Sequence, residues 1–146
     1  YKFATERSKY LSDLGIPLNT DSTLKGQTVF LAERCAELMN ENIITDRTIF
    51  DVMAFTMNAK SIPHQDKDIF ESYAKEFIRE YDYIFYISPH GIPIEDNGVR
   101  ETDEHYRDII DFTITTLIKR YGHMTKKVET IKGSTEDRIK QILSYL

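Results

Sequence analysis

The chain has 146 residues, of which 40% are hydrophobic and 29% are charged, and its formal net charge is −5. These values are typical of one globular domain, and the acidic balance disfavours general affinity for nucleic-acid backbone or anionic lipid. No apolar run reaches the ~18 residues that a membrane span needs, so we expect no membrane partner. Cys35 is the one cysteine and cannot form an internal disulfide, which favours a reducing, cytoplasmic setting.

The first half of the chain alternates between strand and helix patterns. The spacing of its apolar residues predicts a strand over 1–5, helices over 7–14 and 23–40, a strand over 42–45 and a helix over 48–59. Cys35 falls on an amphipathic stretch, which favours a place in the core over the role of a nucleophile.

The second half continues the alternation. After a break at 61–66, we expect an amphipathic helix that ends near Tyr81 and then the nearly continuous apolar strand "YIFYIS", the pattern of a strand buried on both faces. A loop over 89–99 is followed by helix 103–121, a strand over 127–132 and a closing helix over 136–146. Such alternation predicts an α/β fold with a mostly parallel sheet in a single domain, 1–146.

Each of the four predicted strands is followed by residues suited to ligand binding. The first strand is followed by Glu6 and Arg7, and the second by Asp46 and Arg47. The loop after the third strand leads to Arg100 and Arg107, and the fourth strand is followed by Gly133, Ser134 and Thr135. Ligands of open α/β sheets bind at the carboxyl ends of the strands. We therefore expect two carboxylates and up to four arginines to converge on one cleft.

This set of side chains suits phosphoryl transfer. One carboxylate holds Mg²⁺ and another orients or deprotonates the attacking hydroxyl, while arginine guanidinium groups neutralise the phosphoryl oxygens. On this interpretation Asp46 faces the metal ion and Arg47 faces the substrate. The four histidines show no metal-ligand spacing among themselves or with Cys35.

Purely structural interpretations of the same residues stay open. The Asp46–Arg47 pair is equally explained as a helix N-terminal cap with a solvated neighbour. Glu6 and Arg7 are better explained as surface charge by themselves, and Asp103 and Arg107 as an i,i+4 ion pair on one helix. The segment "GST" before the last helix is also an ordinary turn and cap.

Four segments resemble the small P-loop kinases grouped with the AAA-type ATPases, especially the ribosylnicotinamide-kinase domain of bacterial NAD-biosynthesis regulators and related phage proteins. They are "ATERSKYL", "IITDRTIFDVMAF", "IEDNGVRETDEHYRDIIDFTITTLIKRYG" and "VETIKGSTEDRIKQIL", and together they cover the whole chain in order. The third is the most specific, because an acidic-Gly-x-Arg loop with a second arginine seven residues later marks the lid of this group.

The resemblance implies a three-layer fold, with a parallel sheet between helices on both faces. It also implies an ATP- and Mg²⁺-dependent kinase of a nucleoside, a nucleotide or a similar small hydroxyl substrate. Position by position, it implies that Glu6 orients the acceptor hydroxyl, that Asp46 lies on the metal side and that Arg47 binds substrate or phosphate.

The later segments carry further implied roles. Arg100 and Arg107 resemble lid arginines that close over the phosphates, within a lid of about 89–107. The loop 133–135 resembles the one that lines the adenine of ATP.

One element of the family has no counterpart in the sequence. The phosphate-binding loop GxxxxGK[ST] is absent, and "LKGQT" supplies only one glycine in another context. In the family, this loop and its central strand precede the segment that resembles "YKFATE". We therefore expect both to lie upstream of Tyr1, and we expect a sheet without that strand to carry unpaired backbone groups.

Two other functions remain open on the sequence. The same site could serve a nucleotide-dependent switch, which would release only phosphate, or the chain could be an interaction module that has lost catalysis. The acceptor substrate and the oligomeric state, including a homo-oligomer, are not determined by any residue pattern.

Overall fold

The computed structural model describes residues 1–93 and 103–146. Its strands and α-helices are β1 (Lys2–Ala4), α1 (Ser8–Asp13), α2 (Leu24–Leu38), β2 (Ile43–Thr45), α3 (Ile49–Met57), α4 (His64–Ala74), β3 (Tyr83–Tyr86), α5 (Glu104–Tyr121), β4 (Lys127–Thr130) and α6 (Thr135–Leu143). Short 3₁₀ helices cover Asn19–Asp21, Lys75–Glu80 and Gly122–Met124. No helix in these two ranges has the length and apolar character to cross a membrane.

The strands form two parallel pairs. β1 pairs with β2, with Phe3 opposite Ile44, and β3 pairs with β4, with Ile84 opposite Val128. The predicted α/β class and parallel pairing are confirmed, but the strands do not form one continuous sheet. Within the described residues every strand pairs with one neighbour, so each has a second edge whose backbone groups bond to no strand.

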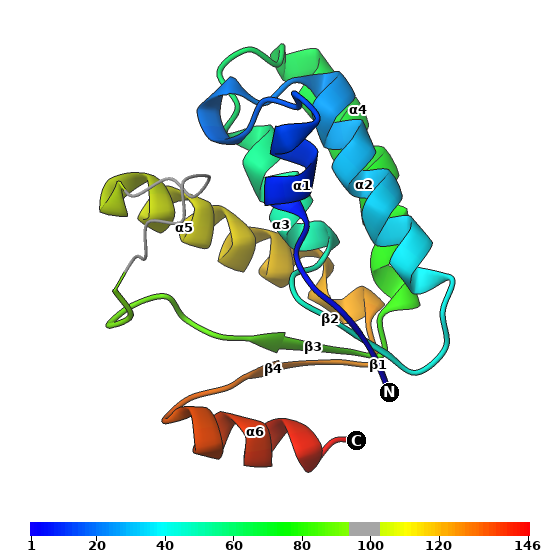
Figure 1. Cartoon of the computed structure of the whole chain (residues 1–146), viewed down its shortest axis with the longest axis vertical. Helices are drawn as coiled ribbons and strands as arrows, with labels where there is room; N and C mark the ends of the chain where they lie inside the picture. Colours follow the sequence, from blue (N-terminus) through cyan, green and yellow to red (C-terminus); the bar gives the residue numbers. More distant parts are fainter. Residues whose placement is uncertain (94–102) are drawn as a thin grey trace.

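Helices lie on both sides of the β3–β4 pair. Figure 1 shows α5 on one side and α6 on the other, while α1 to α4 gather beyond β1 and β2. The principal core lies in this helical layer. Its centre is α3, where Ile49, Phe50, Met53 and Ala54 are almost completely buried. Around them pack buried side chains of α2, α4 and α5, namely Leu31, Phe70, Ala74, Ile110 and Leu117.

The predicted burial of β3 on both faces is wrong for one face. Ile84 is buried, whereas its neighbour Tyr83 is 38% exposed. Tyr83 and Phe85 point to the α6 side, where both rings contact Tyr145. The strand is apolar along its length because one of its faces packs toward the helical layer and the other carries aromatic side chains that contact the Tyr145 ring.

The predicted helix before β3 begins earlier and ends differently. The segment "HQD" was expected in a break, but α4 begins at His64 because Pro63 sits at its N-cap, where a missing backbone N–H costs nothing. Its predicted continuation to Tyr81 is a 3₁₀ helix, Lys75–Glu80, which tightens the chain before β3.

Candidate functional site

A groove with a volume of about 1260 Å³ runs along the inner edges of β2 and β3. Its walls include all residues of both strands and the residues that flank them, from Asn40 to Asp46 on one side and from Glu80 to Pro89 on the other. Side chains of α5 also line it, and so do Ile142 and Tyr145 near the C-terminus. The groove thus lies between the two strand pairs and follows both strands along their length.

Four of the residues predicted for the site line this one groove. They are Glu6, Asp46, Arg47 and Arg107, which come from the ends of β1 and β2 and from α5. Gly133, Ser134 and Thr135 are not among the described residues that line it. Arg100 and the part of the predicted lid at 94–102 lie outside the described residues.

The Asp46–Arg47 turn leaves β2 in an unusual backbone conformation. Arg47 has φ of 78°, a left-handed value that costs a non-glycine residue roughly 1 kcal/mol. Asp46 N–H donates to the carbonyl of Ala4 at 2.9 Å, and Thr45 Oγ1 donates to the carbonyl of Arg47 at 2.9 Å. Strained backbone that neighbouring groups hold in place is typical of functional sites.

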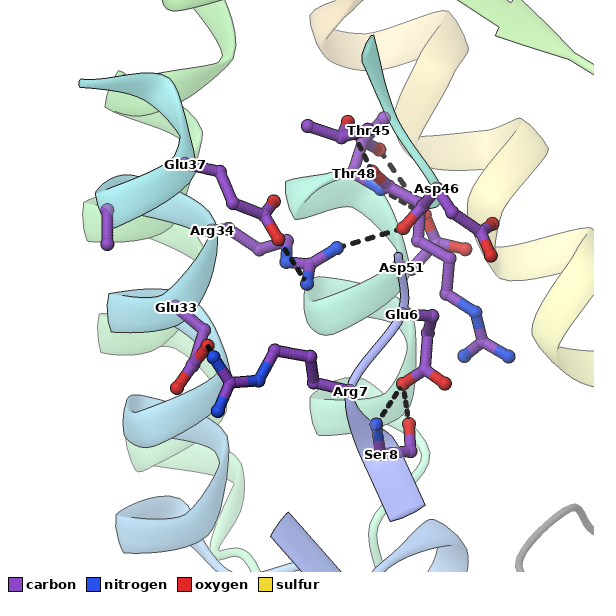
Figure 2. Close-up of polar contacts among 12 residues, drawn as sticks. Glu6, Arg7, Ser8, Glu33, Arg34, Glu37, Thr45, Asp46, Thr48 and Asp51 are labelled. Atoms are coloured by element: carbon purple, nitrogen blue, oxygen red, sulfur yellow. Dashed lines mark hydrogen bonds and ion pairs between the residues drawn. The ribbon is translucent and has the colours of Figure 1, made fainter. Parts of the chain in front are cut away.

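Asp46 does not cap the helix that follows it. Thr48 is the N-cap of α3, and its hydroxyl and the Asp51 carboxylate form a reciprocal capping box. The Asp46 side chain points away from α2 in Figure 2, is exposed, and makes no hydrogen bond or ion pair with another described residue. The capping interpretation of Asp46 is therefore wrong, and its carboxylate is available to a ligand.

A pair of alanine variants distinguishes the two roles by stability. Thr48→Ala is expected to lower the free energy of unfolding by about 1 kcal/mol, because it removes the acceptor for the first-turn N–H groups of α3. Asp46→Ala is expected to change the same free energy by less than about 0.5 kcal/mol. Urea denaturation of both variants measures the difference, and equal losses would restore Asp46 as a cap.

Glu6 has both a local role and a free oxygen. Its Oε1 accepts hydrogen bonds from the backbone N–H of Ser8, at 2.5 Å, and from the Ser8 hydroxyl (Figure 2). These bonds fix the start of α1 and leave Oε2 without a hydrogen bond from another described residue, while Glu6 itself lines the groove. Arg7 turns elsewhere and forms an ion pair with Glu33 at 3.4 Å, as expected for surface charge.

A buried ion pair on α2, which was not predicted, contacts the backbone of the Asp46–Arg47 turn. Arg34 on α2 is only 4% exposed, and its Nη2 lies 2.8 Å from Oε1 of Glu37. Burial raises the pKa of the Glu37 carboxyl, and the nearby positive charge of Arg34 only partly offsets this effect. The signal in the sequence was a charged residue one turn after Leu31, on the apolar face of α2.

Arg107 and the loop after β3 form the opposite wall. Arg107 Nη1 donates to the carbonyl of Ile92 at 2.6 Å, and its Nε is buried without a hydrogen-bond partner in the described ranges. Asp103 caps α5 by accepting from the backbone N–H of His105 at 2.9 Å. One side of the Arg107 guanidinium thus ties the loop to α5.

Tyr86 and Asp111 form a second polar contact on this wall that was not predicted. The Tyr86 hydroxyl donates to Oδ1 of Asp111 at 2.5 Å, and Nε2 of His90 lies 3.6 Å from Oδ2. Burial, and then the hydrogen bond and charge of Asp111, raise the pKa of Tyr86 to about 12. The neutral phenol is therefore the stable form, so Tyr86 serves as a donor here and not as a base.

Tyr86→Phe is expected to have a pH-dependent effect on stability. Near neutral pH, the loss of a hydrogen bond to a charged acceptor lowers the free energy of unfolding by about 1.5 kcal/mol. Tyr86 ionises at about pH 10 when unfolded, but its folded pKa is about 12. Its contribution is present below the lower value and is lost as the pH rises through the higher one, so the difference between wild type and variant should shrink.

Urea denaturation at a series of alkaline pH values measures this difference. Tyr73→Phe at an exposed position is the control and should change the free energy of unfolding by less than about 0.5 kcal/mol. A wild-type advantage that stays constant across the alkaline series would contradict the assignment.

The segment 133–135 has the geometry of a turn and cap. Gly133 has φ of 102°, and a Cβ at this position would lie 3.0 Å from the Asp137 carboxylate. Ser134 is the N-cap of α6 and shares a capping box with Asp137. The local structural interpretation explains these residues fully, and their predicted contact with adenine stays a prediction.

The described residues offer no metal cage built from protein side chains alone, but one exposed carboxylate fits a metal ion that is shared with a substrate. No group of three or more His, Cys, Asp or Glu side chains gathers for a metal ion in the described part of the chain. Mg²⁺ is commonly held by one or two carboxylates together with phosphate oxygens and water, and the exposed Asp46 carboxylate fits that arrangement.

Comparisons with known proteins found no match: no family model, no curated protein and no solved structure matches the chain.

Proposed function

We propose that the chain carries the acceptor and metal side of an ATP- and Mg²⁺-dependent phosphotransferase that acts on a nucleoside, a nucleotide or a similar small hydroxyl substrate. The observation that carries the proposal is that Glu6, Asp46, Arg47 and Arg107 line one groove. ATP as the donor fits the reducing, cytoplasmic setting suggested by the single Cys35.

The proposed roles follow from which atoms are free. Oε2 of Glu6 accepts the hydrogen of the acceptor hydroxyl and orients its oxygen for attack. The Asp46 carboxylate holds Mg²⁺, which, when bound, neutralises charge on the transferred phosphoryl group. Arg47 and Arg107 contribute guanidinium groups to the same charge. Arg47 lies over the Phe55 ring, with 5.8 Å between the guanidinium carbon and the ring centroid, which restricts its motion.

A further part of the proposal concerns the space between the strand pairs. Within residues 1–93 and 103–146, β2 and β3 each present an unpaired edge to the groove, and the groove follows both strands. We infer that one extended strand from outside residues 1–146 fills it and joins the two pairs into a single parallel sheet. The loop that follows such a strand would lie beside Asp46, where a phosphate-binding loop is needed.

The test is a thermal-shift panel on the full-length parent protein. ATP with Mg²⁺ is expected to raise the melting temperature, because a ligand at 100 times its Kd adds about 2.7 kcal/mol to the free energy of unfolding. Nucleosides are then screened for an ATP-dependent phosphorylated product. Release of phosphate without such a product would favour the nucleotide switch, and no response to any nucleotide would overturn the proposal.

A further inference from the structure

We propose that Arg34 is a positioning residue that fixes the Asp46–Arg47 turn in its active shape. The inference rests on the proposed function of the turn, but the contacts behind it can be tested without that function. Arg34 is among the residues that line the groove, but its guanidinium bonds to Glu37 and to the Asp46 carbonyl, so we assign it a role that acts through the backbone of Asp46.

The guanidinium of Arg34 bridges two elements. Nη2 lies 2.8 Å from Oε1 of Glu37 on the same helix, and Nη1 donates to the backbone carbonyl of Asp46 at 2.9 Å. Figure 2 shows the guanidinium between the Glu37 carboxylate and the end of β2. Because Arg34 is almost fully buried, neither bond is exchanged readily for a bond to water.

The turn needs such support because its backbone is strained. Arg47 holds a left-handed φ of 78°, which side chains with a Cβ disfavour. Three hydrogen bonds hold the turn. The Asp46 N–H donates to β1, Arg34 donates to the Asp46 carbonyl, and the Thr45 hydroxyl donates to the Arg47 carbonyl. Of these three hydrogen bonds, only the one from Arg34 comes from the helical layer.

The energetics of the buried pair separate a positioning role from a folding role. Buried ion pairs add little net stability, and apolar replacements of similar volume commonly hold a fold equally well. This pair is also incompletely satisfied, since Glu37 Oε2 is buried without a hydrogen-bond partner among residues 1–93 and 103–146. An apolar pair cannot reproduce the hydrogen bond to the Asp46 carbonyl, so that bond is the distinctive contribution of Arg34.

The experiment uses the double variant Arg34→Met/Glu37→Leu and amide hydrogen exchange. The melting temperature should stay close to that of the wild type, while the Asp46 amide should exchange about tenfold faster, the equivalent of one hydrogen bond to a charged group. The Ile131 amide, which donates to Tyr86 in the other strand pair, should not change. The same two replacements in the exposed pair Arg79 and Glu76 provide the control and should leave Asp46 unaffected.

Two more variants keep the inference falsifiable. If the double variant does not fold, Arg34→Gln removes the reach to Asp46 while leaving a neutral donor beside Glu37, and the same faster exchange is expected. Arg47→Gly in the double-variant background should restore much of the protection, because glycine adopts left-handed φ without strain. Unchanged exchange at Asp46 in both Arg34 variants would overturn the inference.

A second measurement distinguishes this inference from the proposed function. In the parent protein, the double variant should lower kcat more than it raises KM for the acceptor, because Arg34 shapes the turn and does not bind the acceptor. If Asp46 exchange increases but wild-type protein never responds to ATP and Mg²⁺, only the proposed function fails. If turnover is present and neither kcat nor Asp46 exchange changes in the variant, only the positioning role fails.

Discussion

Asp46→Asn in the parent protein is expected to reduce phosphotransfer by at least roughly 100-fold, the loss seen when one group that stabilises transition-state charge is removed. The amide keeps the size of the side chain but lacks the negative charge that attracts Mg²⁺. The fold should be unaffected, since the Asp46 carboxylate makes no hydrogen bond or ion pair with another described residue. Steady-state kinetics at saturating ATP, with Mg²⁺ varied, measure the effect.

The matched control is Asp13→Asn, at an exposed residue at the end of α1. It makes the same chemical change away from the groove and should leave turnover within about twofold of the wild type, as is usual for surface substitutions. Full turnover in the Asp46 variant would remove this residue from the mechanism. An equal loss in both variants would point to a general effect of net charge.

Phe50→Ala is expected to lower the free energy of unfolding by about 3–5 kcal/mol. Phe50 is 1% exposed in the first turn of α3, where the packing of α2, α4 and α5 converges, and a cavity at that point cannot collapse easily. Urea denaturation with far-ultraviolet circular dichroism measures the loss.

Phe112→Ala is the matched control, because it removes the same ring from a residue that is 72% exposed on α5. Its expected effect is below about 0.5 kcal/mol. Similar losses for both variants would mean that α3 does not lie at the centre of the core.

The order of elements could be predicted because each has a local signal. The helix over 103–121 was predicted from its apolar stripe and the stop at Gly122, and α5 has nearly these bounds. The start at His64 was missed because Pro63 was interpreted as part of a break, although proline is well suited to the position before a helix. The exposure of Tyr83 could not be predicted, since it depends on which helix covers each face of β3.

The candidate site could be predicted in outline because parallel strands deliver their carboxyl ends to one edge. This rule placed Glu6 and Asp46 on one groove without any knowledge of their side-chain contacts. The hydrogen bonds of Glu6 to Ser8 and the support of Arg34 behind Asp46 could not be predicted in the same way. They depend on how α1 and α2 sit against the strands, which only tertiary packing determines.

The closing helix, α6, is attached more weakly than the rest of the molecule. None of the nine residues of α6 is buried, and apolar side chains such as Leu143 remain largely in water. Its attachment includes the Tyr145 ring against β3 and a hydrogen bond from the side chain of Gln141 to the carbonyl of Lys132. Such a segment opens at little cost while the remainder stays folded. A protease should therefore cut α6 more readily than α3, and sequence changes in α6 should be tolerated far better than changes in α3.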